Sequence, residues 1–132
     1  MKKVLLEQFE KMMAYDVVEN NACIEVEFRV DGSVEYESCW LGKTVGREVP
    51  IKADYWYGLM PDGSESYNFD SLHDFVNAPV FHGENIRDIW DCITLISIDG
   101  CDIDWRLTHY LGAEPGSIRS PAPQPEDLYR RR

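Results

Sequence analysis

The sequence predicts an α+β domain in which helices pack on one antiparallel sheet. Three patterns support this fold: an apolar repeat with helical spacing at the N-terminus, two neighbouring segments in which apolar and polar residues alternate, and short helical segments between the later strands. The chain has 132 residues, of which 44% are hydrophobic. A single domain with its own buried core is expected at this length and composition.

The first element is an amphipathic helix over residues 3–14. Its apolar residues recur every three or four positions, and its charged residues lie largely on the other side. The apolar stripe consists of Val4, Leu5, Leu6, Phe9, Met12 and Met13.

A central β-hairpin follows over residues 23–40. Apolar and polar residues alternate on both sides of an Asp-Gly turn, which is typical of two half-buried strands. The expected register places Phe28 opposite Val34 and Val26 opposite Tyr36. The predicted buried face carries Ile24, Val26, Phe28, Val34 and Tyr36, and Val30 and Trp40 continue the same apolar alternation.

A third strand is predicted over residues 47–57, where Pro50 indicates an edge position or a strand end. Residues 67–69 are expected to form a short return strand. Ser71 begins a capping-box pattern, which predicts a short helix that ends before Pro79. The inward side chains of the third strand are expected to be Val49, Ile51, Ala53, Tyr55 and Tyr57.

The last part of the domain contains a second short helix over residues 86–93 and a buried strand over residues 93–98. Residues 101–111 fit two structures: alternating apolar positions favour a strand, whereas helical spacing that ends at Gly112 favours a helix. We expect a strand paired with residues 93–98, because Asp99-Gly100 is a typical hairpin turn.

The charged residues divide the chain into two parts. Residues 1–115 carry 22 acidic and 9 basic side chains and form the predicted domain. Residues 116–132 have prolines at alternate positions and end in Arg-Arg-Arg, which predicts an extended tail. The formal net charge of −11 argues against direct binding to nucleic acid or to an anionic membrane, and it favours a basic protein partner.

The composition also indicates the compartment. No apolar run approaches the roughly 20 residues of a membrane-spanning helix, and the N-terminus has no signal-peptide cleavage site. Four cysteines are too few for a disulfide scaffold. We therefore expect a cytoplasmic protein with free thiols.

The acidic face of the hairpin is the leading candidate site. The expected register places Glu25 opposite Glu37 and Glu27 opposite Glu35, with Asp31 at the tip. Like charges directly opposite each other destabilise a sheet by roughly 0.2–1 kcal/mol per pair. Such a grid of carboxylates fits a basic groove that binds phosphates, although a solvated face is the alternative.

Trp56 is the candidate apolar anchor for the same partner. If Tyr55 faces the core, Trp56 lies on the opposite side of its strand together with Lys52 and Asp54. An exposed tryptophan is a preferred interface residue. Coverage of Trp56 by another element of the chain is the alternative.

Metal and catalytic chemistry have weaker support. Asp99, Asp102 and Asp104 lie beside a turn and are weak candidates for Mg²⁺ or Ca²⁺, but Arg106 stands where a further oxygen ligand would be needed. The histidines and cysteines show no spacing typical of a metal site or of an activated nucleophile. No cofactor and no catalytic residue are predicted.

In size, charge and acidic face, the chain resembles in kind the small acidic proteins with which phages and bacteria neutralise nucleases, such as anti-restriction, anti-CRISPR and toxin-immunity proteins. The resemblance implies an inhibitor that occupies the basic groove of a nucleic-acid-handling enzyme. A small enzyme or ligand-binding domain, with a pocket between sheet and helices, is one alternative. An accessory subunit of a larger complex is another, and the oligomeric state is open.

Overall fold

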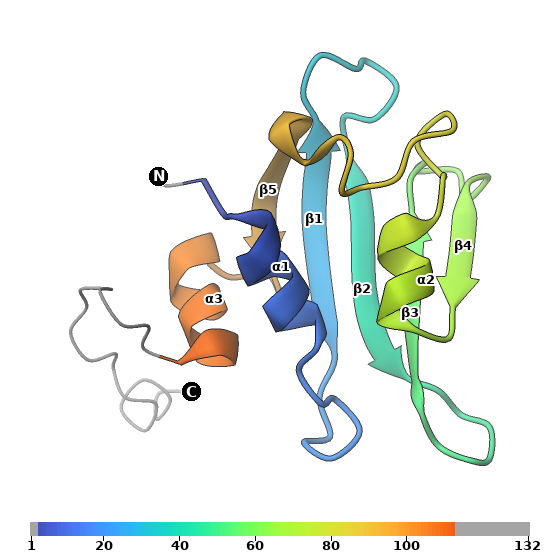
Figure 1. The fold of residues 1–132 in the computed structure, drawn as a ribbon, viewed down its shortest axis with the longest axis vertical. Helices are drawn as coiled ribbons and strands as arrows, with labels where there is room; N and C mark the ends of the chain where they lie inside the picture. Colours follow the sequence, from blue (N-terminus) through green and yellow to red (C-terminus); the bar gives the residue numbers. More distant parts are fainter. Residues whose placement is uncertain (1–2, 113–132) are drawn as a thin grey trace.

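A computed structural model describes residues 3–112, and these residues form one antiparallel sheet with helices packed on it (Figure 1). The predicted α+β fold is confirmed, whereas the predicted tail over residues 116–132 lies outside the described residues. The elements in chain order are α1 (Leu6–Met13), β1 (Ile24–Val30), β2 (Cys39–Val45), β3 (Ala53–Gly58), β4 (Ser66–Phe69), α2 (Leu72–Asn77), the 3₁₀ helix η1 (Trp90–Cys92), β5 (Ile93–Ile98) and α3 (Ile103–Leu111).

The strand order in the sheet is β4-β3-β2-β1-β5. Strands β1 to β4 follow one another as antiparallel neighbours, and β5 returns to pair with the free edge of β1. Helices α1 and α2 lie across one face of the sheet, and α3 contacts β5 and α1 (Figure 1). No described helix covers the opposite face.

One apolar core fills the space between the sheet and the helices. Every second residue of β1 to β4 points into it, and the helices contribute their apolar stripes. In β5 an irregularity in the pairing with β1 interrupts the alternation, so that Ile93, Leu95 and Ile98 point inward. Its fully buried members include Phe9, Met12, Met13, Ile24, Val26, Phe28, Leu41, Leu59, Phe75, Ile86 and Ile98. None of the helices over residues 3–112 has the length and apolar character needed to cross a membrane.

A hairpin forms from β1 and β2, but the strand predicted over residues 33–40 is mostly a loop, and the predicted register is wrong. Strand β2 begins only at Cys39, so Phe28 lies opposite Cys39 and Val26 lies opposite Leu41. The predicted partner Val34 is 84% exposed.

Long-range contacts of Tyr36 explain the irregular loop over residues 31–38. The Tyr36 hydroxyl donates a hydrogen bond to Oε1 of Glu65 at 3.0 Å, and its ring packs edge-on against Phe81. Tyr36 is therefore buried, as predicted, but as part of a loop. Local alternation carries no information about these distant partners.

The third strand is shorter than predicted. Strand β3 begins at Ala53, and a hydrogen bond from Gly46 N to Lys52 O closes a loop that extends beyond the end of the sheet (Figure 1). Val49 and Ile51, predicted to point inward, are 89% and 50% exposed in this loop. Tyr55 and Tyr57 face the core as predicted.

The segment after β5 is helix α3, so the predicted strand over residues 101–111 is wrong. Asp99-Gly100 does form a turn, but it supports only an isolated bridge between Ile98 and Cys101. The Asp102 side chain then accepts a hydrogen bond from Trp105 N, which caps the new helix at its N-terminus. Gly112, with φ 75°, ends it.

The remaining elements follow their sequence patterns closely. The N-terminal helix, the return strand at residues 66–69 and the strand over residues 93–98 are present. The Ser71 side chain caps α2 by accepting a hydrogen bond from Asp74 N. The helix predicted over residues 86–93 is reduced to the short η1 and a preceding turn.

Candidate functional site

The face of the sheet opposite the helices carries the side chains that alternate with the core residues, and it is termed the open face. Cross-strand partners share a face of the sheet, so the strand registers define its members. They are Glu25, Glu27 and Arg29 of β1, Trp40, Gly42 and Thr44 of β2, Asp54, Trp56 and Gly58 of β3, Ser66 and Asn68 of β4, and Thr94 and Ser97 of β5.

Two tryptophans occupy the middle of the open face in a reciprocal arrangement. Strands β2 and β3 each contain a Trp-X-Gly sequence, and their register places Trp40 opposite Gly58 and Trp56 opposite Gly42. The two tryptophans are therefore diagonal neighbours on adjacent strands, a position in which the Cα atoms of two residues lie about 7–8 Å apart. Trp40 is 39% exposed and Trp56 is half-buried.

The two glycines have different surroundings. A Cβ atom on Gly42 would lie 2.5 Å from Cζ2 of Trp56 and 2.3 Å from the carbonyl oxygen of Ile24. The indole of Trp56 thus extends from β3 across Gly42 of β2. A Cβ atom on Gly58 would meet nothing within 4 Å, so the face is open beside Trp40.

Acidic side chains surround the two indoles. Glu27 lies directly opposite Trp40, and Glu25 lies opposite Gly42, the residue that the Trp56 ring crosses. Asp54 precedes Trp56 by two residues on the same side of β3. Within the described part of the chain, these three carboxylates make no ion pair or hydrogen bond. The indole N–H groups of Trp40 and Trp56 likewise have no acceptor among residues 3–112.

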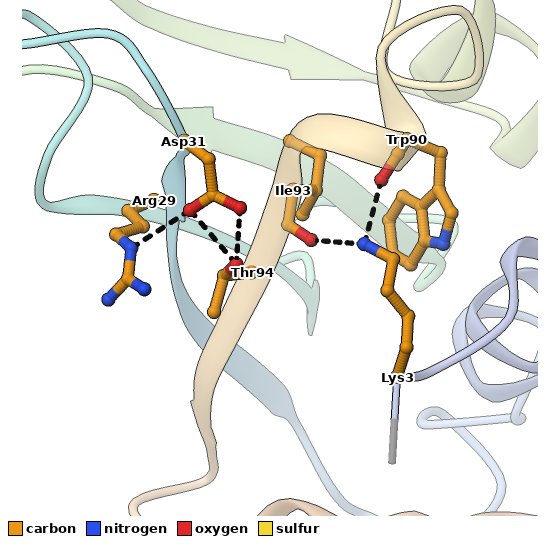
Figure 2. A network of polar contacts seen from close by, with 6 residues as sticks. All are labelled: Lys3, Arg29, Asp31, Trp90, Ile93 and Thr94. Atoms are coloured by element: carbon orange, nitrogen blue, oxygen red, sulfur yellow. Dashed lines mark hydrogen bonds and ion pairs between the residues drawn. The ribbon is translucent and has the colours of Figure 1, made fainter. Parts of the chain in front are cut away.

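The one basic residue on the open face is neutralised. Arg29 Nε lies 3.0 Å from Oδ1 of Asp31, and the Thr94 hydroxyl donates to the same carboxylate at 2.7 and 3.0 Å (Figure 2). The hydrogen bond from Thr94, followed by that from Arg29, holds the pKa of Asp31 below its ordinary value of 3.8. The net charge of the open face is thus set by Glu25, Glu27 and Asp54.

Contacts on the other side of β5 hold this end of the sheet in place. Lys3 Nζ donates to the carbonyl oxygens of Trp90 at 3.2 Å and Ile93 at 2.7 Å (Figure 2). Asp31 N also donates to Cys92 O at 2.7 Å. Lys3 and Asp31 therefore fix the start of β5 from two directions.

The structure places the six predicted partner-binding residues in three groups. Glu25, Glu27 and Trp56 share the open face, and Asp31 lies at its end. The other two, Glu35 and Glu37, belong to the loop over residues 31–38.

The predicted opposition of like charges is wrong. Glu25 lies opposite Gly42 and Glu27 opposite Trp40, because β2 starts five residues later than the predicted partner of Phe28. Oε1 of Glu35 instead lies 2.8 Å from Nε2 of His82, and His82 belongs to a loop that follows α2. Two of the four glutamates still share a face, but without a facing acidic partner.

Trp40 is the residue that sequence reasoning missed. The irregular loop before β2 changes the parity of the strand, so that Cys39 is buried and Trp40 points outward, although the alternation grouped Trp40 with Val34 and Tyr36. Burial raises the pKa of the Cys39 thiol to about 12. The sequence repeats Trp-X-Gly at Trp40-Leu41-Gly42 and Trp56-Tyr57-Gly58, but this repeat alone does not determine which side of each strand faces outward.

The aspartates considered as weak metal candidates serve the packing of α3. Asp99 accepts hydrogen bonds from Glu25 N and Arg106 Nε, each at 2.8 Å, and from the Tyr110 hydroxyl. Asp102 caps α3. Over residues 3–112, no three His, Cys, Asp or Glu side chains form a group that could hold a metal ion.

A hollow of about 400 Å³ lies beside the start of α1, away from the predicted position between sheet and helices. Its lining consists of Lys3, Val4, Leu5, Leu6, Arg87, Asp88, Trp90 and Asp91. These residues include no serine, cysteine or histidine.

Comparison with known proteins adds no relative to this picture. No family model, no curated protein and no solved structure matches the chain. The chemistry of the open face is therefore the basis on which a function can be assigned.

Proposed function

We propose that this chain is an acidic protein-binding module that places its open face on a basic partner and thereby covers the partner's own binding groove. The observation that carries the proposal is the pair of tryptophans, Trp40 and Trp56, at the centre of a sheet face that no helix of residues 3–112 covers. The three carboxylates around them make no ion pair within this part of the chain. Tryptophans near the centre of a surface, within a polar rim, are the usual anchors of protein interfaces.

The charge of the molecule supports a basic partner. Residues 1–115 carry 22 acidic and 9 basic side chains, so a positively charged protein is attracted before contact. Electrostatic attraction of this kind raises the association rate and excludes acidic partners. Enzymes that handle nucleic acids have basic grooves, and they form the partner class that this charge fits best.

The proposal is tested by capture with matched variants. The wild-type chain, the triple variant Glu25→Gln/Glu27→Gln/Asp54→Asn and a control with three neutralised acids elsewhere, Glu19→Gln/Glu48→Gln/Glu84→Gln, are immobilised and exposed to a lysate of the host. We expect the wild type and the control to retain the same basic protein, the open-face variant to lose it, and salt to weaken retention.

The captured protein is then assayed for nuclease activity with and without the chain. Inhibition by the wild type and by the control, but not by the open-face variant, supports the proposed function. Equal retention by all three chains would place the contact elsewhere on the molecule.

A further inference from the structure

The open face contains two units in which an indole adjoins a carboxylate. In one row of the sheet, Trp40 lies directly opposite Glu27. In the next row, the Trp56 ring extends from β3 across Gly42 of β2, and Gly42 pairs on its other side with Glu25 of β1. Each unit offers an aromatic surface and a negative charge side by side.

These two units suit one cationic group each, and arginine fits them better than lysine. The planar guanidinium stacks on an indole ring while its N–H groups bind a carboxylate in its own plane. A lysine ammonium is compact and strongly hydrated, so it gains less from an exposed aromatic ring. The absence of another partner for Glu25 and Glu27 among the described residues leaves both carboxylates available.

The spacing of the units specifies the form of the ligand. Glu25 and Glu27 are two residues apart on β1, and their partners Gly42 and Trp40 are two residues apart on β2. Two residues of a strand span about 6.6–6.8 Å. An extended segment repeats its side chains on one side with the same spacing, so arginines at positions i and i+2 reach both units together.

We infer that the open face binds an extended Arg-X-Arg segment of its partner, with one guanidinium between Trp40 and Glu27 and the other between Trp56 and Glu25. This inference rests on the proposed function and specifies the partner's chemistry. The segment runs along the strands of the sheet. The indole N–H groups of Trp40 and Trp56, which have no acceptor within residues 3–112, can donate to its backbone carbonyls.

Three labelled peptides of equal length and charge test the inference by fluorescence anisotropy on the full chain at low salt. The first contains Ser-Arg-Ser-Arg-Ser, the second has the same composition with adjacent arginines, and the third replaces both arginines by lysine. Adjacent arginines in an extended segment point to opposite sides, so only the first peptide reaches both units. We expect it to bind about tenfold more tightly than either of the others.

Two variants locate the peptide on the face. Trp40→Leu removes the aromatic surface and Glu27→Gln removes the charge, and each is expected to reduce the preference for the first peptide to about threefold or less. Glu84→Gln, an exposed acid outside the open face, is the matched control and should leave the preference unchanged. Circular dichroism on each variant establishes that it is folded.

The outcomes separate this inference from the proposed function. Equal affinity of the three peptides overturns the Arg-X-Arg specificity, even if the captured basic protein still depends on the open face. A tenfold preference that survives both Trp40→Leu and Glu27→Gln also overturns it, because the peptide then binds elsewhere. A preference lost in these two variants and kept in Glu84→Gln supports it.

Discussion

The indole of Trp56 crosses Gly42 so closely that a single added carbon at Gly42 would lie 2.5 Å from the ring. This contact determines how the tryptophan lies on the open face, because a side chain at position 42 would push the ring away from the sheet. The same atom would lie 2.3 Å from the backbone carbonyl of Ile24, which cannot move without disturbing β1. Gly42 is therefore required both for the sheet and for the shape of the proposed binding surface.

Gly42→Ala is accordingly expected to destabilise the protein by about 1–3 kcal/mol, the usual cost of an overpacked position. Gly58→Ala is the matched control, since its Cβ would meet nothing within 4 Å, and it should change the free energy of unfolding by no more than about 0.5 kcal/mol. Urea denaturation of the two variants measures both effects. Equal stability of Gly42→Ala and Gly58→Ala would contradict the close contact.

A second pair of variants tests the register of the central hairpin. Phe28 is fully buried against the aromatic ring of Phe81, so Phe28→Ala should cost about 3–5 kcal/mol. Val34, the partner that alternation assigned to Phe28, is 84% exposed, and Val34→Ala should cost less than about 0.5 kcal/mol. A large loss in both variants would restore the predicted pairing of these two residues.

The predicted and the observed hairpin differ for physical reasons that can be traced to particular residues. Strand β1 alternates cleanly and α2 begins with a capping serine, so local chemistry alone predicts both elements. The start of β2 could not be predicted, because it depends on the contacts of Tyr36 with Glu65 and Phe81, far along the chain. This shift in parity concealed Trp40, while Glu25, Glu27 and Trp56 kept their predicted side of the sheet.

Helix α3 stands where the sequence predicted a strand, for a different reason. Asp99-Gly100 forms the turn that the sequence predicts, with φ 55° and 76°, but the chain then enters a helix in place of a paired strand. The Asp102 cap and the ion pair between Asp99 and Arg106 favour the helix. The cap joins residues only three positions apart, whereas the ion pair depends on the helix already being formed.

Lys43 provides a test of a buried polar contact that no local pattern predicted. Its side chain leaves β2 on the core side and donates to the carbonyl oxygens of Met13, the last residue of α1, at 2.9 Å and of Tyr15 at 2.6 Å. Lys43→Met would leave these carbonyls without their donor, at a cost of about 1–3 kcal/mol. Lys52→Met removes an exposed lysine with only a long contact to Asp70 and is the control.

The prediction for Lys43 is measured by chemical denaturation of both variants. We expect a clearly lower midpoint for Lys43→Met and an almost unchanged midpoint for Lys52→Met. Similar midpoints would mean that water replaces the ammonium group without loss.

The Asp31 network predicts a dependence of stability on pH. Hydrogen bonds from Thr94 and Arg29 lower the pKa of Asp31 in the folded state, so its carboxylate stabilises the fold above the ordinary value of 3.8. This contribution is lost as the pH falls from that value through the lower folded pKa. Asp31→Asn should therefore be less stable than the wild type at pH 6, and the difference should shrink below pH 3.8.

Thermal unfolding of wild type and Asp31→Asn across this pH range measures the effect. Asp62→Asn removes a second acid whose pKa is lowered, here by hydrogen bonds from Ser64 on a distant turn, so it should show the same pH trend without any change to the Asp31 network. A gap between wild type and Asp31→Asn that stays constant with pH would contradict the role of the Asp31 charge.

Charge reversal at Glu27 separates folding from binding. In the observed register Glu27 lies opposite Trp40 and Glu35 lies beside His82, so the two glutamates are not neighbours. The effects of Glu27→Lys and Glu35→Gln on the free energy of unfolding should therefore add within about 0.5 kcal/mol. Coupling beyond this limit would indicate that the two side chains do meet.

The same charge reversal should act strongly on the proposed interaction. Glu27→Lys places a positive charge beside Trp40, where the proposal puts an arginine of the partner, so affinity for the basic partner should fall by tenfold or more at low salt. The loss should shrink as salt rises, because screening weakens the repulsion between like charges at the interface. Glu84→Lys makes the same change in net charge outside the open face, and it should reduce affinity only slightly through the overall field. If the two variants weaken binding equally, the net charge of the molecule attracts the partner and the open face has no special part in it.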